Sequence, residues 1–403
     1  MRTLPAIIRR LAFSRLSVCP LSNKAWSRRL RVDAAGDIGS GCGGVCKTTR
    51  DASQAMNELE QRIHNEIAQK GGIPFRRFME LALYEPGLGY YEKQHKVGRR
   101  GDFFTSVSVG SVFGELLAFQ FSEWLAELEG PIQLVEAGAH DGRLANDILE
   151  TFRVWHPGIY ERMTFVLLEP SRVRQEWQSE MLASHEGKIQ WRKEMPPAIH
   201  GVFFCNELLD AFPAQKLEWD SETKSWFECG VGESGGQFEW HRMDAVKDSW
   251  NVGGGLPDGT GMVQVPTLTP FWNEVCTSLR KGRAVAIDYF LEEEEFFAPP
   301  RPHGTLRAYH GQRQTDNLLA NVGEQDLTAS VNLAALGFAA EAAGVHERIV
   351  STQAQWLVSI FEKTLQNQDC FPEWTPERIR QFQTLVHPEH LGRAFKVLEN
   401  WRG

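Results

Sequence analysis

A strand, a glycine-bearing turn and the start of a helix follow one another in Ile132-Gln133-Leu134-Val135-Glu136-Ala137-Gly138-Ala139-His140-Asp141-Gly142-Arg143-Leu144. The apolar run before Gly138 is short, as in a parallel strand that is covered on both faces. After Gly142, apolar residues recur at helical spacing as far as Phe152. The stretch predicts an α/β fold with a glycine loop at the carboxyl end of a strand, where open sheets bind ligands.

This loop has too few glycines for a dinucleotide. A pyrophosphate needs G-x-G-x-x-G, because the backbone must approach it closely at a helix N-terminus. Here only Gly138 and Gly142 remain, with the bulky His140 between them. The pattern is similar to the acid-x-Gly-x-Gly-x-Gly loop of class I methyltransferases without its middle glycine. We therefore predict an S-adenosylmethionine (SAM) site at Glu136, Gly138, His140 and Gly142, with an ordinary strand-to-helix turn as the alternative.

A second acid supports the cofactor site. Residues 164–168 form another apolar run that ends at Glu169, and an amphipathic stretch follows from Arg172. An acid at the tip of the second strand is placed to accept the ribose hydroxyls of a bound nucleoside. We predict that Glu169 has this role, although a Glu at a strand end also commonly lies beside a helix cap.

The first fifty residues differ from the rest of the chain in charge. They carry ten Lys or Arg against two acids, whereas residues 51–403 carry a net charge of −17, because the whole chain has −9. The acidic body argues against nucleic-acid binding. The Arg-rich leader, residues 1–55, is typical of a mitochondrial transit peptide and places the protein in the mitochondrial matrix. The alternative is an overcalled start upstream of Met56 in a protein of the bacterial cytoplasm.

The body is predicted to be an α/β fold with a Rossmann-like sheet. We expect an N-terminal helical region at 56–130, a sheet domain at 131–348 with a β-rich insertion at about 215–275, and C-terminal helices at 349–403. No stretch approaches the roughly 20 apolar residues of a membrane span. The cysteines are scattered singly, so we predict neither a disulfide framework nor a metal site.

Several motifs resemble one family. Glu85-Pro86-x-x-Gly89-Tyr90-Tyr91 is followed by Gly101-Asp102-Phe103-x-Thr105-Ser106, and later by Asn206-Glu207-Leu208-Leu209-Asp210-Ala211-Phe212-Pro213 and Gly304-Thr305-Leu306-Arg307-x-Tyr309. Together with Asp326-Leu327-Thr328 they are similar to the MidA-like class I SAM-dependent methyltransferases, over roughly residues 57 to 360. This family includes a mitochondrial complex I assembly factor that methylates arginine. The resemblance implies methylation of an arginine on a partner protein, a respiratory-complex subunit among the mitochondrial members, and adds Gly101, Asp102 and Thr105 to the cofactor site.

The chain also departs from the family pattern. The family usually has Thr-Ser-Pro-Glu-Ile where Thr105-Ser106-Val107-Ser108-Val109 stands, and Leu-Thr-Ala-His-Val-Asp where Leu327-Thr328-Ala329-Ser330-Val331-Asn332 stands. An acid, a His and an Asp are therefore missing. These losses leave open a SAM-binding assembly factor with weakened catalysis. A small-molecule methyltransferase, or a nucleotide-binding enzyme with another ligand, is the remaining alternative.

A guanidinium is charged and poorly nucleophilic at neutral pH, so carboxylates must orient it for methyl transfer. Glu207, at a strand tip beside Asn206 and close to Asp210, is our candidate for this role. The alternative is that these three residues form a helix N-cap cluster. Asp288 is a weaker candidate, and Arg307 is expected to pair with Glu207 or Asp288.

Overall fold

The computed structural model describes residues 56–93, 105–246, 256–292, 295, 304–311 and 313–403. All of them belong to one unit, Ala55–Gly403. The leader lies outside the described residues, and so do Gly101 and Asp102, two of the predicted cofactor ligands.

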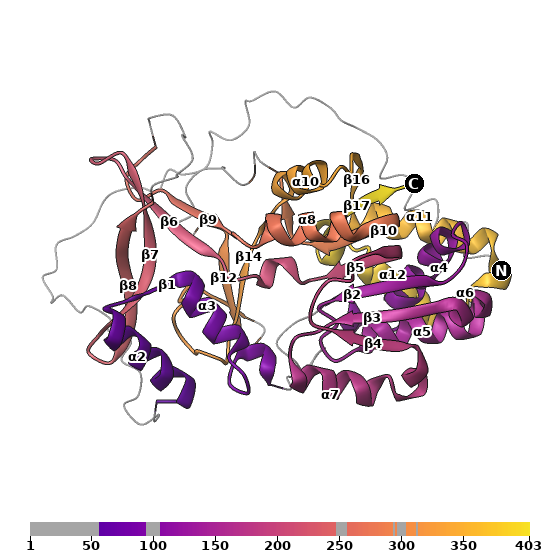
Figure 1. The fold of residues 1–403 in the computed structure, drawn as a ribbon, viewed down its shortest axis with the longest axis horizontal. Helices are drawn as coiled ribbons and strands as arrows, with labels where there is room; N and C mark the ends of the chain where they lie inside the picture. The colour runs from indigo at the N-terminus through magenta and orange to yellow at the C-terminus, as the bar shows by residue number, and fades with distance from the viewer. Residues whose placement is uncertain (1–55, 94–104, 247–255, 293–294, 296–303, 312) are drawn as a thin grey trace, which may run out of the picture. The chain divides into compact units, whose positions relative to one another are not determined.

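A seven-stranded sheet forms the centre of this unit, in the order β16-β17-β10-β5-β2-β3-β4 (Figure 1). Its strands are β2 (Ile132–Ala137), β3 (Met163–Leu168), β4 (Ile189–Arg192), β5 (Ile199–Asn206), β10 (Leu279–Asp288), β16 (Glu347–Thr352) and β17 (Lys396–Arg402). The first five are parallel, and β17 runs antiparallel to both of its neighbours. The predicted Rossmann-like α/β fold is confirmed.

The direction of winding reverses at β2. From β2 the chain continues to β3 and β4 on one side, and β5 then pairs with the other side of β2. Such a reversal leaves a crevice at the carboxyl ends of the two central strands. These ends carry Glu136 and Asn206, so the topology brings two predicted site residues together.

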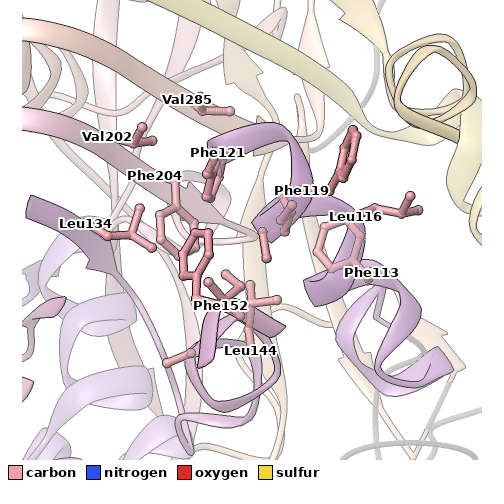
Figure 2. Close-up of a cluster of buried hydrophobic side chains, with 14 of the residues drawn as sticks. Phe113, Leu116, Phe119, Phe121, Leu134, Leu144, Phe152, Val202, Phe204 and Val285 are labelled. Atoms are coloured by element: carbon pink, nitrogen blue, oxygen red, sulfur yellow. The ribbon is translucent and has the colours of Figure 1, made fainter. Parts of the chain in front are cut away.

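Helices cover both faces of the sheet. One face packs against α4 (Val112–Ala126), α5 (Arg143–Trp155), α11 (Gln353–Gln366) and α12 (Pro376–Leu385), and the other against α8 (Leu268–Ser278) and α10 (Leu333–Ala342). Figure 2 shows the first layer, where Phe121 of α4 and Phe152 of α5 lie close to Phe204 of β5. The ring centroids of Phe121 and Phe204 are 5.2 Å apart. Burying one large apolar side chain stabilises the fold by roughly 1.5–3 kcal/mol, and these contributions together hold the helices on the sheet.

A second group of elements, which we call the accessory lobe, packs around its own core. It contains α2 (Glu58–Lys70), α3 (Phe75–Tyr84), β1 (Ile73–Pro74), β6 (Gln215–Asp220), β7 (Ser225–Ser234), β8 (Gln237–Ala245), β9 (Gly261–Gln264), β12 (Leu306–His310), β13 (Arg313–Thr315) and β14 (Asp326–Ala329). Apolar residues of α2, α3, β12 and β14 form one cluster with Val231 and Val263. β1 pairs with β7, so the N-terminal helices and the insertion belong to the same lobe.

The remaining elements are short. They are α6 (Pro157–Arg162), α7 (Arg172–Met181), α13 (Leu391–Ala394), the paired strands β11 (Phe290–Leu291) and β15 (Val331–Asn332), and the 3-10 turns η1 (Tyr90–Glu92), η2 (Val107–Val109), η3 (Ala183–Lys188), η4 (Leu209–Ala211) and η5 (Gln368–Cys370). No helix among the described residues is long and apolar enough to cross a membrane.

Two of the predicted regions differ from the structure. Residues 56–130 are divided, because α2 and α3 join the accessory lobe whereas α4 packs on the main sheet. Residues 349–403 contain α11, α12 and α13, but they also contain the end of β16 and all of β17. The strand β17 was missed because a short run that is buried on both faces has no strand periodicity to detect.

Candidate active site

A cavity of about 1160 Å³ opens at the carboxyl ends of β2, β3 and β5, with β12 and β14 of the accessory lobe contributing to its wall. Most of the predicted site residues line it, namely Thr105, Glu136, Gly138, His140, Glu169, Asn206, Glu207 and Asp210. Gly142 is not among the lining residues and instead occupies the position before α5. The structure therefore gathers residues from three strands around one space.

The glycine loop is built from backbone conformations that most residues avoid. Gly138 has φ 80°, and a Cβ at this position would lie 2.9 Å from Cδ1 of Leu208. Gly142 has φ 83° and precedes the first turn of α5. His140 also has a positive φ, of 47°, and its ring centroid lies 6.1 Å from that of Trp177. Its side chain is 30% exposed, so the imidazole borders the cavity and contacts α7.

Glu136 is a buried carboxylate with an unsatisfied oxygen. Its relative exposure is 2%, and Oε2 has no hydrogen-bond partner. Burial, together with the nearby charge of Asp141, raises the pKa of Glu136 to about 8. An acceptor left unpaired inside a cavity fits a ligand that brings its own donors, such as the ammonium group of a bound amino acid.

We expect Glu136→Gln to change how stability depends on pH. A folded-state pKa above the unfolded value of 4.5 means that protonation stabilises the fold. This contribution is complete below pH 4.5 and is lost as the pH rises through about 8. Between pH 5 and pH 9, the free energy of unfolding of wild type should therefore fall by on the order of a few kcal/mol relative to that of Glu136→Gln, as measured by urea unfolding without ligand. The exposed Glu127→Gln should follow wild type, and parallel curves for Glu136→Gln would contradict the pKa shift.

Glu169 is held by protein groups on three sides. Its carboxylate accepts hydrogen bonds from the backbone N of Ser171 (2.9 Å) and from Nε2 of Gln178 (3.1 Å), and pairs with Nη2 of Arg174 (2.9 Å). A carboxylate offers about four acceptor sites, so one remains. Binding of ribose hydroxyls by Glu169 stays a prediction. Arg174 and Gln178, which hold its carboxylate, were not predicted from the sequence.

The tip of β5 presents Asn206 and Glu207 to the cavity. Glu207 has φ 51°, and its Oε1 accepts hydrogen bonds from the backbone N of Ser106 (3.3 Å) and from Nδ2 of Asn206 (3.1 Å). Burial raises the pKa of Glu207 to about 7, although these two hydrogen bonds oppose the shift. Oδ1 of Asn206 is buried and has no partner. The pair therefore offers the cavity one titratable carboxylate and one free acceptor.

Asp288 holds the turn that follows Glu207. Its Oδ2 accepts hydrogen bonds from the backbone N of Leu208 (3.2 Å) and of Leu209 (2.8 Å), and its Oδ1 from the N of Tyr289 (2.8 Å). The alternative interpretation, in which Asn206, Glu207 and Asp210 form an N-cap cluster, is wrong, because the short helix η4 has Leu208 at its N-cap position and no side-chain cap. Burial raises the pKa of Asp288 to about 6.

Further acids and tyrosines complete the wall. Burial and the charges of Asp288 and Asp326 raise the pKa of Asp210 well above its usual range. The hydroxyl of Tyr91 donates to Oδ1 of Asp326 (2.7 Å), and that of Tyr84 donates to the carbonyl of Ala211 (2.8 Å). Asp326 was not among the predicted site residues, although it belongs to the motif Asp326-Leu327-Thr328.

One expectation needs correction, and two residues that depart from the family pattern can be placed. Arg307 lines the cavity, but within the described residues it forms no ion pair with Glu207 or Asp288. Asn332, which stands where the family has Asp, caps α10 by accepting from the backbone N of Ala334 (2.9 Å) and of Ala335 (3.3 Å). Asn and Asp are about equally good N-caps, so this replacement keeps the cap. Ser330 lines the cavity where the family has His.

Comparison with known proteins points to one family. A family described as S-adenosyl-L-methionine-dependent methyltransferases matches residues 116–351. The chain is similar to the protein arginine methyltransferase NDUFAF7, mitochondrial, of Mus musculus, at 23% identity over 87% of each chain. It is similar also to the Drosophila melanogaster homologue, at 28% identity over 87% of this chain and 86% of the relative.

A solved structure shares the fold over most of its length. It is a methyl transferase superfamily member from Burkholderia thailandensis, bound to S-adenosyl-homocysteine. The two chains are 26% identical, the TM-score is 0.73, and the match covers 85% of this chain and 92% of that one.

Proposed function

Since this chain belongs to the MidA-like family of SAM-dependent methyltransferases, we propose that it methylates an arginine guanidinium on a partner protein. The relatives named above are protein arginine methyltransferases. The observation that carries the proposal is the Glu207 carboxylate, which borders the cavity and is fixed by Ser106 and Asn206. A buried carboxylate is the group that can hold and orient a guanidinium.

The residues present fit the cofactor. Oε2 of Glu136 and Oδ1 of Asn206 are buried acceptors without partners among the described residues, and Gly138 lines the same cavity without a side chain. We propose that Glu136, Gly138, His140 and Glu169 hold SAM, with Gly101, Asp102 and Thr105 from the preceding loop. Gly142 has an indirect part in this proposal, because it ends the glycine loop at the start of α5. Bound SAM supplies an electrophilic methyl group.

The protein's own contribution is positioning and charge. Glu207 orients the guanidinium and concentrates its positive charge away from the attacking nitrogen. After transfer, the methylated nitrogen must release a proton, and a carboxylate with a pKa of about 7 can accept it near neutral pH. Asn206 and Asp210 complete the proposed substrate site, because both line the cavity beside Glu207.

The proposal is tested by labelled-methyl transfer. Purified protein is incubated with methyl-labelled SAM and an extract from cells that lack this gene, and labelled proteins are identified by mass spectrometry. We expect methylarginine on a small number of proteins, a respiratory-complex subunit among them if the mitochondrial members are a guide. SAM binding without any labelling would favour the assembly factor with weakened catalysis, and label on small molecules alone would favour the small-molecule enzyme.

The pH profile gives a second expected result. The ionised form of Glu207 holds the guanidinium, so kcat/KM should rise about tenfold per pH unit below pH 7 and level off above it. The midpoint of the pH profile of kcat should lie at a lower pH than that of kcat/KM, because a bound cation favours the ionised carboxylate. Activity that falls as the pH rises through 7 would contradict this assignment.

The location of the protein is proposed from the leader and the relatives. Residues 1–55 have the composition of a transit peptide, and the relatives are named as mitochondrial. A mitochondrial location follows if residues 1–55 direct a fluorescent fusion to mitochondria. A diffuse signal would favour the bacterial cytoplasm as the origin of the chain.

A further inference from the structure

One wall of the cavity is a two-stranded ladder from the accessory lobe. β12 and β14 are antiparallel, with Arg307 opposite Thr328 and Tyr309 opposite Asp326. Alternate residues of a strand point to opposite faces, so these four side chains share one face. All four line the cavity, whereas Leu306, Ala308 and Leu327 of the other face are buried in the core of the lobe.

Arg307 stands out on this face because its charge is not matched. Among the described residues, its guanidinium makes no hydrogen bond and no ion pair. By contrast, the buried Arg174 at the same cavity pairs with both Glu92 (3.0 Å) and Glu169 (2.9 Å). Asp326, the acid diagonal to Arg307 on the ladder, accepts the hydroxyl of Tyr91. The strand pairing thus fixes Arg307 at the cavity without giving it an anion.

An unmatched cation conflicts with a site that receives a guanidinium. Like charges in a partly desolvated cavity repel, so Arg307 would weaken substrate binding unless an anion arrives with a ligand. A guanidinium presents a planar fork of donors that fits a carboxylate in a bidentate way. The missing partner is therefore best supplied by a carboxylate of a bound molecule.

We propose that Arg307 binds a carboxylate that enters the cavity with a ligand. This carboxylate has two possible sources, the methionine carboxylate of SAM or an acidic residue beside the methylated arginine. The second source rests on the proposed function, whereas the first needs only the cofactor. In either case Arg307 is a specificity-determining residue, because a ligand without this carboxylate leaves its guanidinium unpaired.

The first arm of the test measures the cofactor. Isothermal titration compares S-adenosylhomocysteine with 5′-methylthioadenosine, which has the same nucleoside but no carboxylate, on wild type and Arg307→Gln. If the cofactor is the source of the carboxylate, Arg307→Gln lowers the affinity for S-adenosylhomocysteine about 10- to 100-fold and leaves the affinity for 5′-methylthioadenosine unchanged. Arg313→Gln is the matched control, since Arg313 is exposed on the neighbouring β13 and does not line the cavity.

The second arm measures the substrate. Short peptides with Asp or Asn beside a single arginine are compared as methyl acceptors. If the substrate is the source, wild type prefers the Asp peptide by about 10- to 100-fold in kcat/KM, and Arg307→Gln loses this preference through KM. Arg307→Lys keeps the positive charge but lacks the planar fork of donors, so it should retain part of the preference for the Asp peptide.

The two arms separate the inference from the proposed function. If no arginine peptide or protein is methylated, the proposed function fails, and the titration alone decides the role of Arg307. Equal loss of affinity for both nucleosides, or unchanged affinity for both together with no preference for the Asp peptide, overturns the inference. The melting temperature of Arg307→Gln should not fall, because no hydrogen bond or ion pair of the side chain within the described residues is lost; a clear fall would assign Arg307 a structural role instead.

Discussion

Glu207→Gln should lower kcat for methyl transfer about 100- to 1000-fold, the loss typical of removing one group that stabilises charge in a transition state. The amide keeps the size of the side chain and can still accept from Ser106 N and contact Asn206, the two groups that fix Glu207. It cannot carry the negative charge that orients a guanidinium, and it cannot accept the released proton. The affinity for S-adenosylhomocysteine should change by less than about threefold.

Stability measurements separate this effect from misfolding. Burial raises the pKa of Glu207 to about 7, so the ionised carboxylate is a cost to the fold above that pH. Glu207→Gln should therefore unfold at the same temperature as wild type or higher at pH 8. The exposed Glu180→Gln on α7 is the control and should keep full activity. Equal labelling of partner proteins by wild type and Glu207→Gln would remove Glu207 from the mechanism.

The sequence predicted the parts of the site that lie on single strands. Glu136 lies near the end of β2 and Gly138 follows it, whereas Asn206 ends β5 and Glu207 follows it. Local patterns were therefore enough to place these residues at one sheet edge. The same patterns could not show that Asp288 accepts the amides of Leu208 and Leu209, because this contact joins two strands far apart in the chain. Such contacts depend on the register of the sheet, which periodicity does not encode.

The accessory lobe was harder to predict for a related reason. Its sheet combines β1, from the N-terminal region, with the strands of the insertion, and its core includes β12 and β14. Asp326 and Arg307 reach the cavity only because these separate segments pack together. Arg307 was expected to pair with an acid, but the charge of a residue does not show where its side chain points in the fold. The ladder between β12 and β14 fixes Arg307 on a wall where it forms no such pair with any residue that the structure describes.

Asp288→Ala is expected to lower both stability and activity. Asp288 is 1% exposed and accepts hydrogen bonds from Leu208, Leu209 and Tyr289. Its removal leaves these buried amides unpaired, which should cost about 3 kcal/mol in the free energy of unfolding. Glu207 has a strained positive φ that persists only while the surrounding turn is fixed. We therefore expect kcat to fall by about 100-fold while the exposed Asp316→Ala stays like wild type.

Asp288→Asn distinguishes a positioning role from a purely structural one. The amide keeps one acceptor oxygen for the turn, so stability and kcat should lie between those of wild type and Asp288→Ala. It also removes a negative charge that raises the pKa of Glu207, after the larger effect of burial. The midpoint of the kcat/KM profile should then move below 7, because Glu207 ionises more easily beside a neutral neighbour. If Asp288 only stabilised the fold, activity would fall with the folded fraction and this midpoint would stay where it is.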